Sequence, residues 1–417
     1  MSRVSSLKSV VEHGLCANCG ICESMAGRDK VEMRLTSYGH LRPQIKGAID
    51  QDVEARILEV CPGAVVTGPT AADPEGFGAI DPVWGPVVSI HRSWAGDPAI
   101  RHRAAAGGTL TALGCYLLQS GEVDAIVHVK AATTDPILTD AHVSYTPAEV
   151  IEGSQSRYGP GAPLVHIDAL LARGLRLAVI AKPCDIAAIR NLARVDARAR
   201  TLVKYCLTLF CGGVPSTGTA KDIAAHFGVA AEELSLFRWR GYGWPGTTHL
   251  ETRDGRSFDL TYDDAWYNPQ ASWTYDMQFR CKICPDAIGE LADVAAPDGW
   301  IMENGVPIHR EGQGVNIAIA RTRAGARLIE RAAAAGALAL DRFSVPELYP
   351  MHGDHLDRKL GQPARNLGLA CAGQPHLRVR RYRPLAMILR AGFMGNWRAF
   401  WGALRRGLKG ANREAGI

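Results

Sequence analysis

Short apolar runs alternate with helix-like segments through the middle of the chain. The runs cover residues 87–94, 125–130, 175–181 and 204–210, and helical patterns cover 109–121, 164–173 and 185–192. Apolar strands without polar alternation are buried on both faces, which requires helices on both sides of the sheet. The pattern therefore predicts an α/β fold (α+β over the whole chain) with a parallel or mixed central sheet.

The composition and the polarity pattern of the sequence change outside these segments. Residues 236–275 are rich in aromatic side chains and alternate in polarity, which predicts a small antiparallel insertion. A stretch rich in Gly, Pro, Ala and Asp ends near residue 86 and indicates a linker. An alanine-rich segment at 323–340 predicts a helix. We expect an N-terminal module at 1–70, a linker at 71–86, the α/β domain at 87–325, and a C-terminal helical region with a basic tail at 326–417.

Composition excludes several classes of protein. The 417 residues are 47% hydrophobic and carry a net charge of +5, which fits a globular protein and is too mild a charge for nucleic-acid binding. There is no uninterrupted apolar stretch of about 18 residues, and the first residues lack an apolar signal core, so we expect a cytoplasmic protein. In that compartment the eleven cysteines favour metal or redox chemistry over a disulfide framework.

The first cysteine set has the spacing of an iron–sulfur ligand group. A C-x-x-C-x-x-C run is followed, 39 positions after its last cysteine (61 − 22), by a Cys-Pro pair. Gly20 lies inside the run, where a loop that wraps a cluster often needs a positive φ. The spacing predicts a [4Fe-4S] cluster rather than zinc in a ferredoxin-like module. Its ligands would be Cys16, Cys19, Cys22 and Cys61.

A second cysteine set is more dispersed. Cys281 and Cys284 form a C-x-x-C pair, which by itself fits a cluster, zinc or a redox disulfide. Cys184 and Cys211 each follow an apolar strand, so they could meet this pair at the carboxyl edge of the sheet, where ligands normally bind. The alternative is burial in the core. Burial is the role that we expect for Cys115, Cys206 and Cys371, although the sequence leaves open whether Cys206 or Cys211 is the ligand.

Several motifs, in order, resemble those of the coenzyme F420 hydrogenase/dehydrogenase beta-subunit family. AGGTLTA (106–112) with GEVDAIV (121–127) is similar to the family's GGxxTAL and GxVDGVV stretches, and KPCDIAAIR (182–190) to its KPCDxxAxR. FCG (210–212) and RCKIC (280–284) with ELAD (290–293) complete the series, which spans residues from about 12 to 325. The family includes subunits that pass electrons between a deazaflavin and a partner, and enzymes that reduce chlorophyll-type pigments from ferredoxin.

The resemblance implies a flavin, FAD or FMN, beside one to three cubane clusters. This chain has cysteines for two [4Fe-4S] clusters, the second at Cys184, Cys211, Cys281 and Cys284. The implied flavin contacts are Gly107, Gly108, Thr109, Ser156, Arg157, Tyr158, Lys182 and Asp293. Without the resemblance, the Gly-Gly pair is a plain turn and the loop at 154–160 a surface turn. The chain departs from the family at Pro297, which replaces a glycine just before Asp298.

We interpret the chain as an iron–sulfur flavoprotein oxidoreductase. A one-electron donor such as ferredoxin would feed the first cluster, and a small-molecule substrate would exchange two electrons with the flavin. The alternative is an electron-transfer beta subunit of a larger hydrogenase or dehydrogenase complex that oxidises or reduces coenzyme F420. The oligomeric state stays open.

The tail at 378–409 is basic and aromatic. It predicts contact with an anionic membrane or with an acidic redox partner. The alternative is a packed terminal helix with a solvated basic face.

Overall fold

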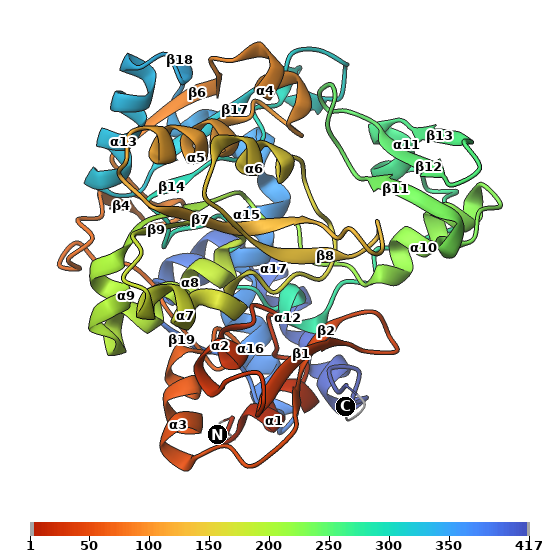
Figure 1. Cartoon of the computed structure of the whole chain (residues 1–417). Helices are drawn as coiled ribbons and strands as arrows, with labels where there is room; N and C mark the ends of the chain where they lie inside the picture. Colours follow the sequence, from red (N-terminus) through yellow and green to blue (C-terminus); the bar gives the residue numbers. More distant parts are fainter. Residues whose placement is uncertain (1–3, 415–417) are drawn as a thin grey trace.

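The structure is a computed structural model and describes residues 4–414. Figure 1 shows a small N-terminal module, a large sheet between helices, and an insertion that stands to one side. In the part of the chain that is described, no helix is long and apolar enough to cross a bilayer.

The N-terminal module packs three short helices against a hairpin. Ser6 and Asp50 cap the first and third helices by accepting hydrogen bonds from backbone amides one turn on, which fixes where these helices begin. The elements are α1 (Leu7–Glu12), α2 (Ile21–Ala26), β1 (Val31–Leu35), β2 (Leu41–Ile45) and α3 (Gln51–Val60).

Two contacts tie this module to the end of the chain. β3 (Val65–Thr67) pairs in parallel with β19 (Arg378–Arg380). The fully buried Arg42 forms an ion pair with Glu414, 2.5 Å apart. The N-terminal module and the last described residues therefore lie side by side, at the lower end of the molecule in Figure 1.

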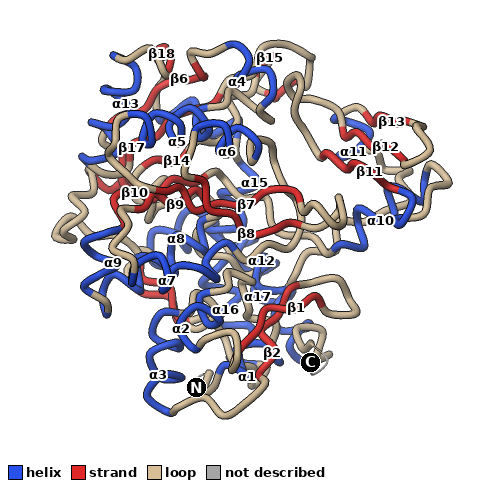
Figure 2. The backbone as a smooth tube through the Cα atoms, in the orientation of Figure 1, coloured by secondary structure: helices blue, strands red, loops and turns tan. Residues whose placement is uncertain are grey.

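The centre of the molecule is an eight-stranded mixed sheet in the order β18-β6-β17-β14-β10-β9-β7-β8. The four strands from β14 to β7 run parallel to one another, and the flanking pairs are antiparallel. The strands cross the molecule between helices (Figure 2). Their bounds are β6 (Ser89–Ala95), β7 (Ala125–Ala131), β8 (Thr139–Ser144), β9 (Leu177–Ile180), β10 (Val203–Thr208), β14 (Val294–Ala295), β17 (Asn316–Ala320) and β18 (Leu338–Arg342).

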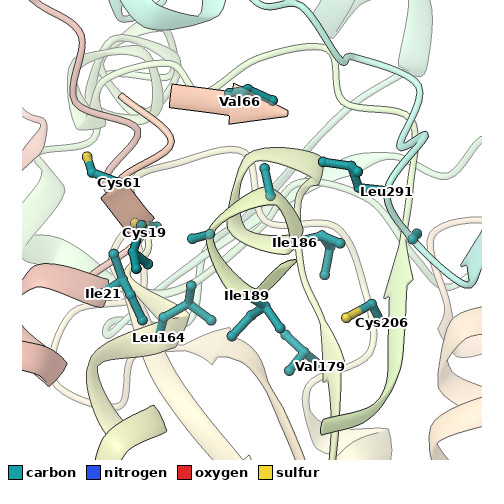
Figure 3. Close-up of a cluster of buried hydrophobic side chains, with 14 of the residues drawn as sticks. Cys19, Ile21, Cys61, Val66, Leu164, Val179, Ile186, Ile189, Cys206 and Leu291 are labelled. Atoms are coloured by element: carbon teal, nitrogen blue, oxygen red, sulfur yellow. The ribbon is translucent and has the colours of Figure 1, made fainter. Parts of the chain in front are cut away.

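Helices cover both faces of the sheet, as the continuous apolar strands predict. Ile126 and Ala178 pack with α5 (Thr109–Gln119) and α13 (Arg323–Ala334) on one face. Val127 and Val179 point to the other face, where they pack with α7 (Ile167–Ala172) and α8 (Pro183–Val195). Figure 3 shows part of this second core, in which Val179 and Ile189 lie close together. Further short helices are α4 (Pro98–Arg103), α6 (Pro147–Glu152) and α9 (Ala197–Leu202).

The aromatic segment forms the expected antiparallel insertion. Its three strands are paired in sequence order around a core of its own that includes Phe237, Trp239 and Trp273. The elements are α10 (Thr217–His226), β11 (Leu234–Arg238), β12 (Thr248–Thr252), β13 (Ser257–Leu260) and α11 (Tyr262–Tyr267).

The sheet continues past residue 325, where we expected the α/β domain to end. The alanine-rich segment is helical only to Ala334, and β18 then adds an edge strand beside β6. The expected linker likewise contains a hairpin of β4 (Ala79–Asp81) and β5 (Gly85–Val87). The helices that follow are α14 (Leu348–Met351), α15 (Gly353–Leu360), α16 (Gln362–Cys371) and α17 (Pro384–Leu408). The remaining short elements are α12 (Phe279–Lys282), β15 (Ile301–Glu303) and β16 (Val306–Ile308).

Candidate functional site

The second cysteine set comes together at the carboxyl edge of the parallel strands. Cys184 lies in the first turn of α8 directly after β9, and Cys211 follows β10, the neighbouring parallel strand. Cys281 lies in α12 and Cys284 just beyond it. All four side chains line one small cavity. The convergence predicted from the strand ends is therefore present, and Cys211 rather than Cys206 faces the C-x-x-C pair.

Cys206 has a different role. It is fully buried in the middle of β10, and its amide donates a hydrogen bond to Asp293 Oδ2 at 2.7 Å. Burial raises the pKa of its thiol to about 12. Cys206 is a core residue, as the sequence suggested, whereas Cys371 is exposed rather than buried.

The thiols of the second set share a partly cationic cavity. Burial, and then the neighbouring Cys281 and Cys284, raise the pKa of Cys211 to about 12. Burial also raises the pKa of Cys184, and Lys182 and Arg280 oppose this rise. Four thiol donors beside the buried Arg280 and the half-buried Lys182 fit a site for an iron–sulfur cluster, because the cations offset part of the cluster's negative charge.

The first cysteine set lies in a tightly wound loop. Asn18 and Gly20 have positive φ values of 51° and 84°, which turn the chain twice between the cysteines. A Cβ on Gly20 would lie 2.6 Å from Val165 Cγ1, so glycine is required there. Figure 3 shows Cys19 and Cys61 close together, and their mutual repulsion, after burial, helps to raise the pKa of Cys19.

The first set also fits a cluster by an independent feature. The Asn18 side chain is fully buried in the loop, yet neither of its polar atoms has a hydrogen-bond partner among residues 4–414. The backbone amide of Asn18 donates to Cys16 Sγ at 3.4 Å. Buried polar atoms without partners are rare and indicate a missing partner, which sulfide or thiolate sulfur would supply to the side-chain amide.

In the described residues, the cysteines of neither set surround a common point as the ligands of a bound metal would. Among residues 4–414, no three Cys, His, Asp or Glu side chains have the arrangement of a metal site. The assignment of iron to either set therefore depends on the donor type, the spacing and the convergence described above.

The two cysteine sets are neighbours. Arg280 donates to the carbonyl oxygen of Pro62, next to Cys61, and lies against Cys184 and Cys284 of the second set. Lys182 acts electrostatically on Cys184 and, more weakly, on Cys19. Arg280 therefore contacts residues of both sets.

The predicted flavin residues lie at four places in the fold. Gly107, Gly108 and Thr109 lie where α5 begins, at the same edge of the sheet as Lys182 and Cys184. Gly108 has a φ of +75°, and a Cβ on Gly107 would lie 2.8 Å from the backbone nitrogen of Asn316. Thr109 is buried, with its hydroxyl 2.8 Å from that of Ser93. The turn is thus required by packing against β6 and β17, and it brings the N-terminus of α5 to this edge.

Lys182 is paired within its own helix. Its Nζ lies 2.7 Å and 2.8 Å from the two carboxylate oxygens of Asp185. Burial alone would lower the pKa of Lys182, but Asp185 and Cys184 raise it, so the amine stays charged. Lys182 lines the cysteine cavity, and its charge there is offset in part by the Asp185 carboxylate.

The loop at 154–160 has a mainly structural arrangement. The Arg157 guanidinium donates to the carbonyl oxygens of Phe237, Pro136 and Leu138, and burial lowers its pKa to about 10. Tyr158 packs edge-on against Trp239 and Trp266 of the insertion. Ser156 is half-buried in the same loop. These residues join the insertion to the sheet, and among residues 4–414 the buried Arg157 Nε has no hydrogen-bond partner.

Asp293 lies at the far end of the sheet from the Gly107 turn. Its carboxylate accepts hydrogen bonds from Arg190, Thr322 and the amide of Cys206, at 3.0, 2.7 and 2.7 Å. It precedes β14, whereas Asp298 follows β14 and pairs with Asn316, which contacts the turn. Asp298, beyond the Pro297 substitution, is therefore the carboxylate at the carboxyl edge.

Sequence reasoning missed the partner of Asp298. Arg240 is fully buried, forms a bidentate pair with Asp298 at 3.1 Å, and lies over the rings of Tyr262 and Trp300. Its only signal was its place in the aromatic segment FRWRGYGW, where the arginine stands among residues that must pack.

A cleft of about 760 Å³ opens beside the second cysteine set. It lies between α15, α17 and the segment around Cys281. Five basic and two acidic residues line it: Lys282, Arg358, Arg365, Arg398, Arg406, Asp354 and Asp357. The cleft therefore presents a net positive surface next to Cys281.

Comparison with known proteins matches two adjacent regions of the chain to one family, the beta subunits of coenzyme F420 hydrogenase/dehydrogenase. Residues 90–167 match the family's N-terminal part, and residues 174–345 match its C-terminal part. The second cysteine set lies inside these regions. The first set and α17 lie outside them.

Individual relatives carry related descriptions. The chain is 27% identical over 210 residues to the F420-dependent formate dehydrogenase 1 subunit beta of Methanococcus maripaludis, covering 48% of this chain and 50% of the relative. It is 35% identical over 219 residues to the F420-dependent formate dehydrogenase subunit beta of Methanocaldococcus jannaschii, covering 51% and 53%. The chain thus spans about half the length of these curated relatives.

The fold also has a solved counterpart. A chain of the F420-reducing [NiFe] hydrogenase complex from Methanosarcina barkeri superposes with a TM-score of 0.54 at 20% identity. The superposition covers 72% of this chain and 98% of that one. At this identity the likeness concerns the fold alone.

Proposed function

The chain belongs to the coenzyme F420 hydrogenase/dehydrogenase beta-subunit family, and from this premise we propose that it is an electron-transfer oxidoreductase with two [4Fe-4S] clusters and a flavin. The observation that carries the proposal is the placement of eight cysteines in two adjacent groups, one of them at the carboxyl edge of the sheet. When bound, the clusters supply one-electron chemistry and the flavin supplies two-electron chemistry.

The chain provides a separate site for each of these groups. The first cluster would bind to the loop at 16–22 and Cys61, and the second to the cavity lined by Cys184, Cys211, Cys281 and Cys284. We place the flavin at the carboxyl edge, against the N-terminus of α5 and near Lys182 and Asp298. A helix N-terminus favours an anionic group there.

A redox partner would dock at the basic cleft beside Cys281. Four arginines line the cleft, and two of them, Arg398 and Arg406, lie on the exposed helix α17. An acidic surface, such as that of a ferredoxin or another ferredoxin-like protein, complements this charge. The second set is also less buried than the first, whose four cysteines are only 6% to 8% exposed. We therefore place the exchange with the partner at the second set, not at the first.

The substrate that the family favours is coenzyme F420. Both formate dehydrogenase relatives are described as F420-dependent, which supports the deazaflavin over a pigment as the two-electron substrate. The test is to reduce the anaerobically purified protein with dithionite, remove the excess, and mix it with oxidised F420. Loss of the deazaflavin absorbance in proportion to protein is expected. If F420 stays oxidised while the protein's own flavin reoxidises with another acceptor, the assignment of F420 is wrong.

A further inference from the structure

The long C-terminal helix α17 exposes an apolar face. Leu385, Leu389 and Phe393 are 70%, 73% and 77% exposed, and they are followed at the same spacing of four residues by Trp397 and Trp401. Together with Met394, these residues form what we call the apolar stripe. The rings of Phe393, Trp397 and Trp401 contact one another in series, with centroids 6.0 Å and 5.4 Å apart. Large apolar side chains in an exposed row usually mark an interaction surface.

The other sides of α17 face the protein, which leaves the apolar stripe exposed. Met387, Ala403 and Gly407 are buried, and Gly368 of α16 approaches the backbone at Phe400 so closely that a Cβ would lie 2.5 Å from its oxygen. Ala399 and Gly402 face the basic cleft. One side of the helix is thus packed on α16 and another lines the cleft, while the stripe occupies the remaining side.

A kink at Gly392 divides the helix, and large apolar side chains are exposed on both sides of it. Gly392 has φ and ψ of 65° and 176°, which no helical residue adopts. The Asn396 side chain donates to the carbonyl oxygens of Ile388 and Gly392 on either side of the kink, at 2.8 and 2.7 Å. Both halves of the helix therefore keep a defined orientation on the protein.

The charge around the stripe has one sign. Residues 384–413 contain no Asp or Glu and include Arg390, Arg398, Arg405, Arg406, Lys409 and Arg413. Within residues 4–414, no ion pair involves Arg405, Lys409 or Arg413, and all three are exposed. These cations lie at the end of the helix just beyond Trp401.

We propose that α17 lies on the surface of an anionic phospholipid bilayer, with the apolar stripe inserted among the lipid headgroups and with Arg405, Lys409 and Arg413 on the lipid phosphates. Tryptophan and phenylalanine beside arginine are the residues that interfacial helices use, and Trp favours this boundary in particular. An acidic protein would match the cations but would leave the row of exposed aromatic rings without an apolar counterpart. The helix is too polar to span the bilayer, which is consistent with a position in the interface.

The test uses the full-length protein with its cofactors and two kinds of vesicle. One is pure phosphatidylcholine, and the other is an equal mixture of phosphatidylcholine and phosphatidylglycerol. We expect flotation with the mixed vesicles at low salt, weaker flotation in high salt, and little with pure phosphatidylcholine. We also expect lipids brominated near the headgroup to quench tryptophan fluorescence, a measurement that requires no variant.

Two variants separate the apolar and the charged contributions. Phe393→Ser/Trp397→Ser/Trp401→Ser should lower partition into mixed vesicles by at least about tenfold, because three aromatic rings no longer insert. Arg405→Gln/Lys409→Gln should lower it several-fold and flatten its salt dependence. Tyr267→Ser/Val306→Ser, which removes similarly exposed apolar side chains elsewhere, should change nothing.

Three results would overturn the proposal. One is the absence of flotation and of quenching with mixed vesicles. Another is equal binding to both kinds of vesicle without any effect of salt. The third is a halved molecular mass of the stripe variant in light scattering, with unchanged flotation, since that would show that a second copy of the chain covers the stripe.

Discussion

Arg280 donates hydrogen bonds from Nε and Nη2 to the carbonyl oxygen of Pro62, at 3.2 and 3.1 Å. This contact joins the Cys-Pro pair of the first cysteine set to the C-x-x-C pair of the second, because Arg280 directly precedes Cys281. The guanidinium is buried, and the thiols of Cys184 and Cys284 of the second set are its neighbours. A single side chain therefore fixes the two groups relative to each other and places a positive charge between them.

Replacing Arg280 separates these two effects. Arg280→Met should make the reduction potentials of both clusters more negative, because reduction adds negative charge that the guanidinium stabilises. Arg280→Lys keeps the charge and should shift the potentials less, while both variants should lower the thermal midpoint through the unpaired Pro62 carbonyl, at a cost of about 1–3 kcal/mol. Redox titration followed by electron paramagnetic resonance measures the shift. Equal potentials in all three proteins would show that Arg280 does not lie between two clusters.

The proposed second cluster predicts which cysteines hold iron. Cys281→Ala and Cys211→Ala should each lower the iron per chain by up to about half, because each removes one of four ligands. Cys206→Ala and Cys371→Ala should leave the iron unchanged, since one lies in the core of β10 and the other on the surface. Iron and acid-labile sulfide are measured on anaerobically purified variants. A loss of iron in Cys206→Ala with none in Cys211→Ala would reverse the assignment.

Asp293 and Asp298 lie at opposite ends of β14, and replacing each by asparagine should affect the protein differently. Asp293→Asn leaves the buried Arg190 without its nearest carboxylate and should destabilise the protein by about 3 kcal/mol, with the flavin content unchanged. Asp298→Asn breaks the pair with Arg240 at the carboxyl edge and should lower the flavin per chain. Thermal unfolding and flavin released by acid give the two readouts. If only Asp293→Asn lost flavin, our placement of the flavin would be at the wrong end of the sheet.

A buried histidine predicts how stability depends on pH. Burial, and then His142, lower the pKa of His128 to about 4, while its Nε2 lies 2.7 Å from Ser144 Oγ. Because the folded pKa lies below the unfolded value of 6.5, the contribution to stability is complete above pH 6.5 and is lost as pH falls through 4. The loss is at most about 3 kcal/mol, at roughly 1.4 kcal/mol for each pKa unit.

The measurement is the thermal midpoint between about pH 7 and pH 4. The midpoint should fall less steeply for His128→Gln than for the native protein. His102→Gln serves as the control, because this histidine is exposed. The same slope in all three proteins would show that His128 titrates normally.

The basic cleft predicts salt-sensitive docking. Arg398→Glu/Arg406→Glu, which changes two exposed arginines of the cleft, should weaken the reaction with an acidic ferredoxin by about tenfold or more at low salt and should reduce its salt dependence. Reduction by dithionite, a small molecule, should not change. Arg253→Glu/Arg310→Glu, away from the cleft, serves as the matched control. An unchanged rate with ferredoxin would remove the cleft as the docking site.

The strands and the convergence of cysteines could be predicted because they follow from local patterns. The four apolar runs form β6, β7, β9 and β10, and each predicted end lies within two residues of the observed one. Strands buried on both faces must be continuously apolar, which makes them recognisable in the sequence. Cys184 and Cys211 follow two of these strands, and parallel strands bring their carboxyl ends to one edge. The C-x-x-C pair joined them as its spacing suggested.

Other features depend on contacts that no local pattern records. β18 follows an alanine-rich helix and could not be distinguished from its continuation before its pairing with β6 was known. Arg157 could not be assigned from its sequence, because the carbonyl oxygens that it binds come from distant segments. The choice between Asp293 and Asp298 depended on which end of β14 each one occupies.

The most direct test of the two-cluster account is a quantitative count of cofactors in the anaerobically purified protein. Iron, acid-labile sulfide and flavin should be measured per chain, together with the visible spectrum before and after dithionite. The account predicts about eight iron and eight sulfide per chain, about one flavin, and a brown colour that dithionite bleaches. A colourless protein that contains zinc in place of iron would contradict it.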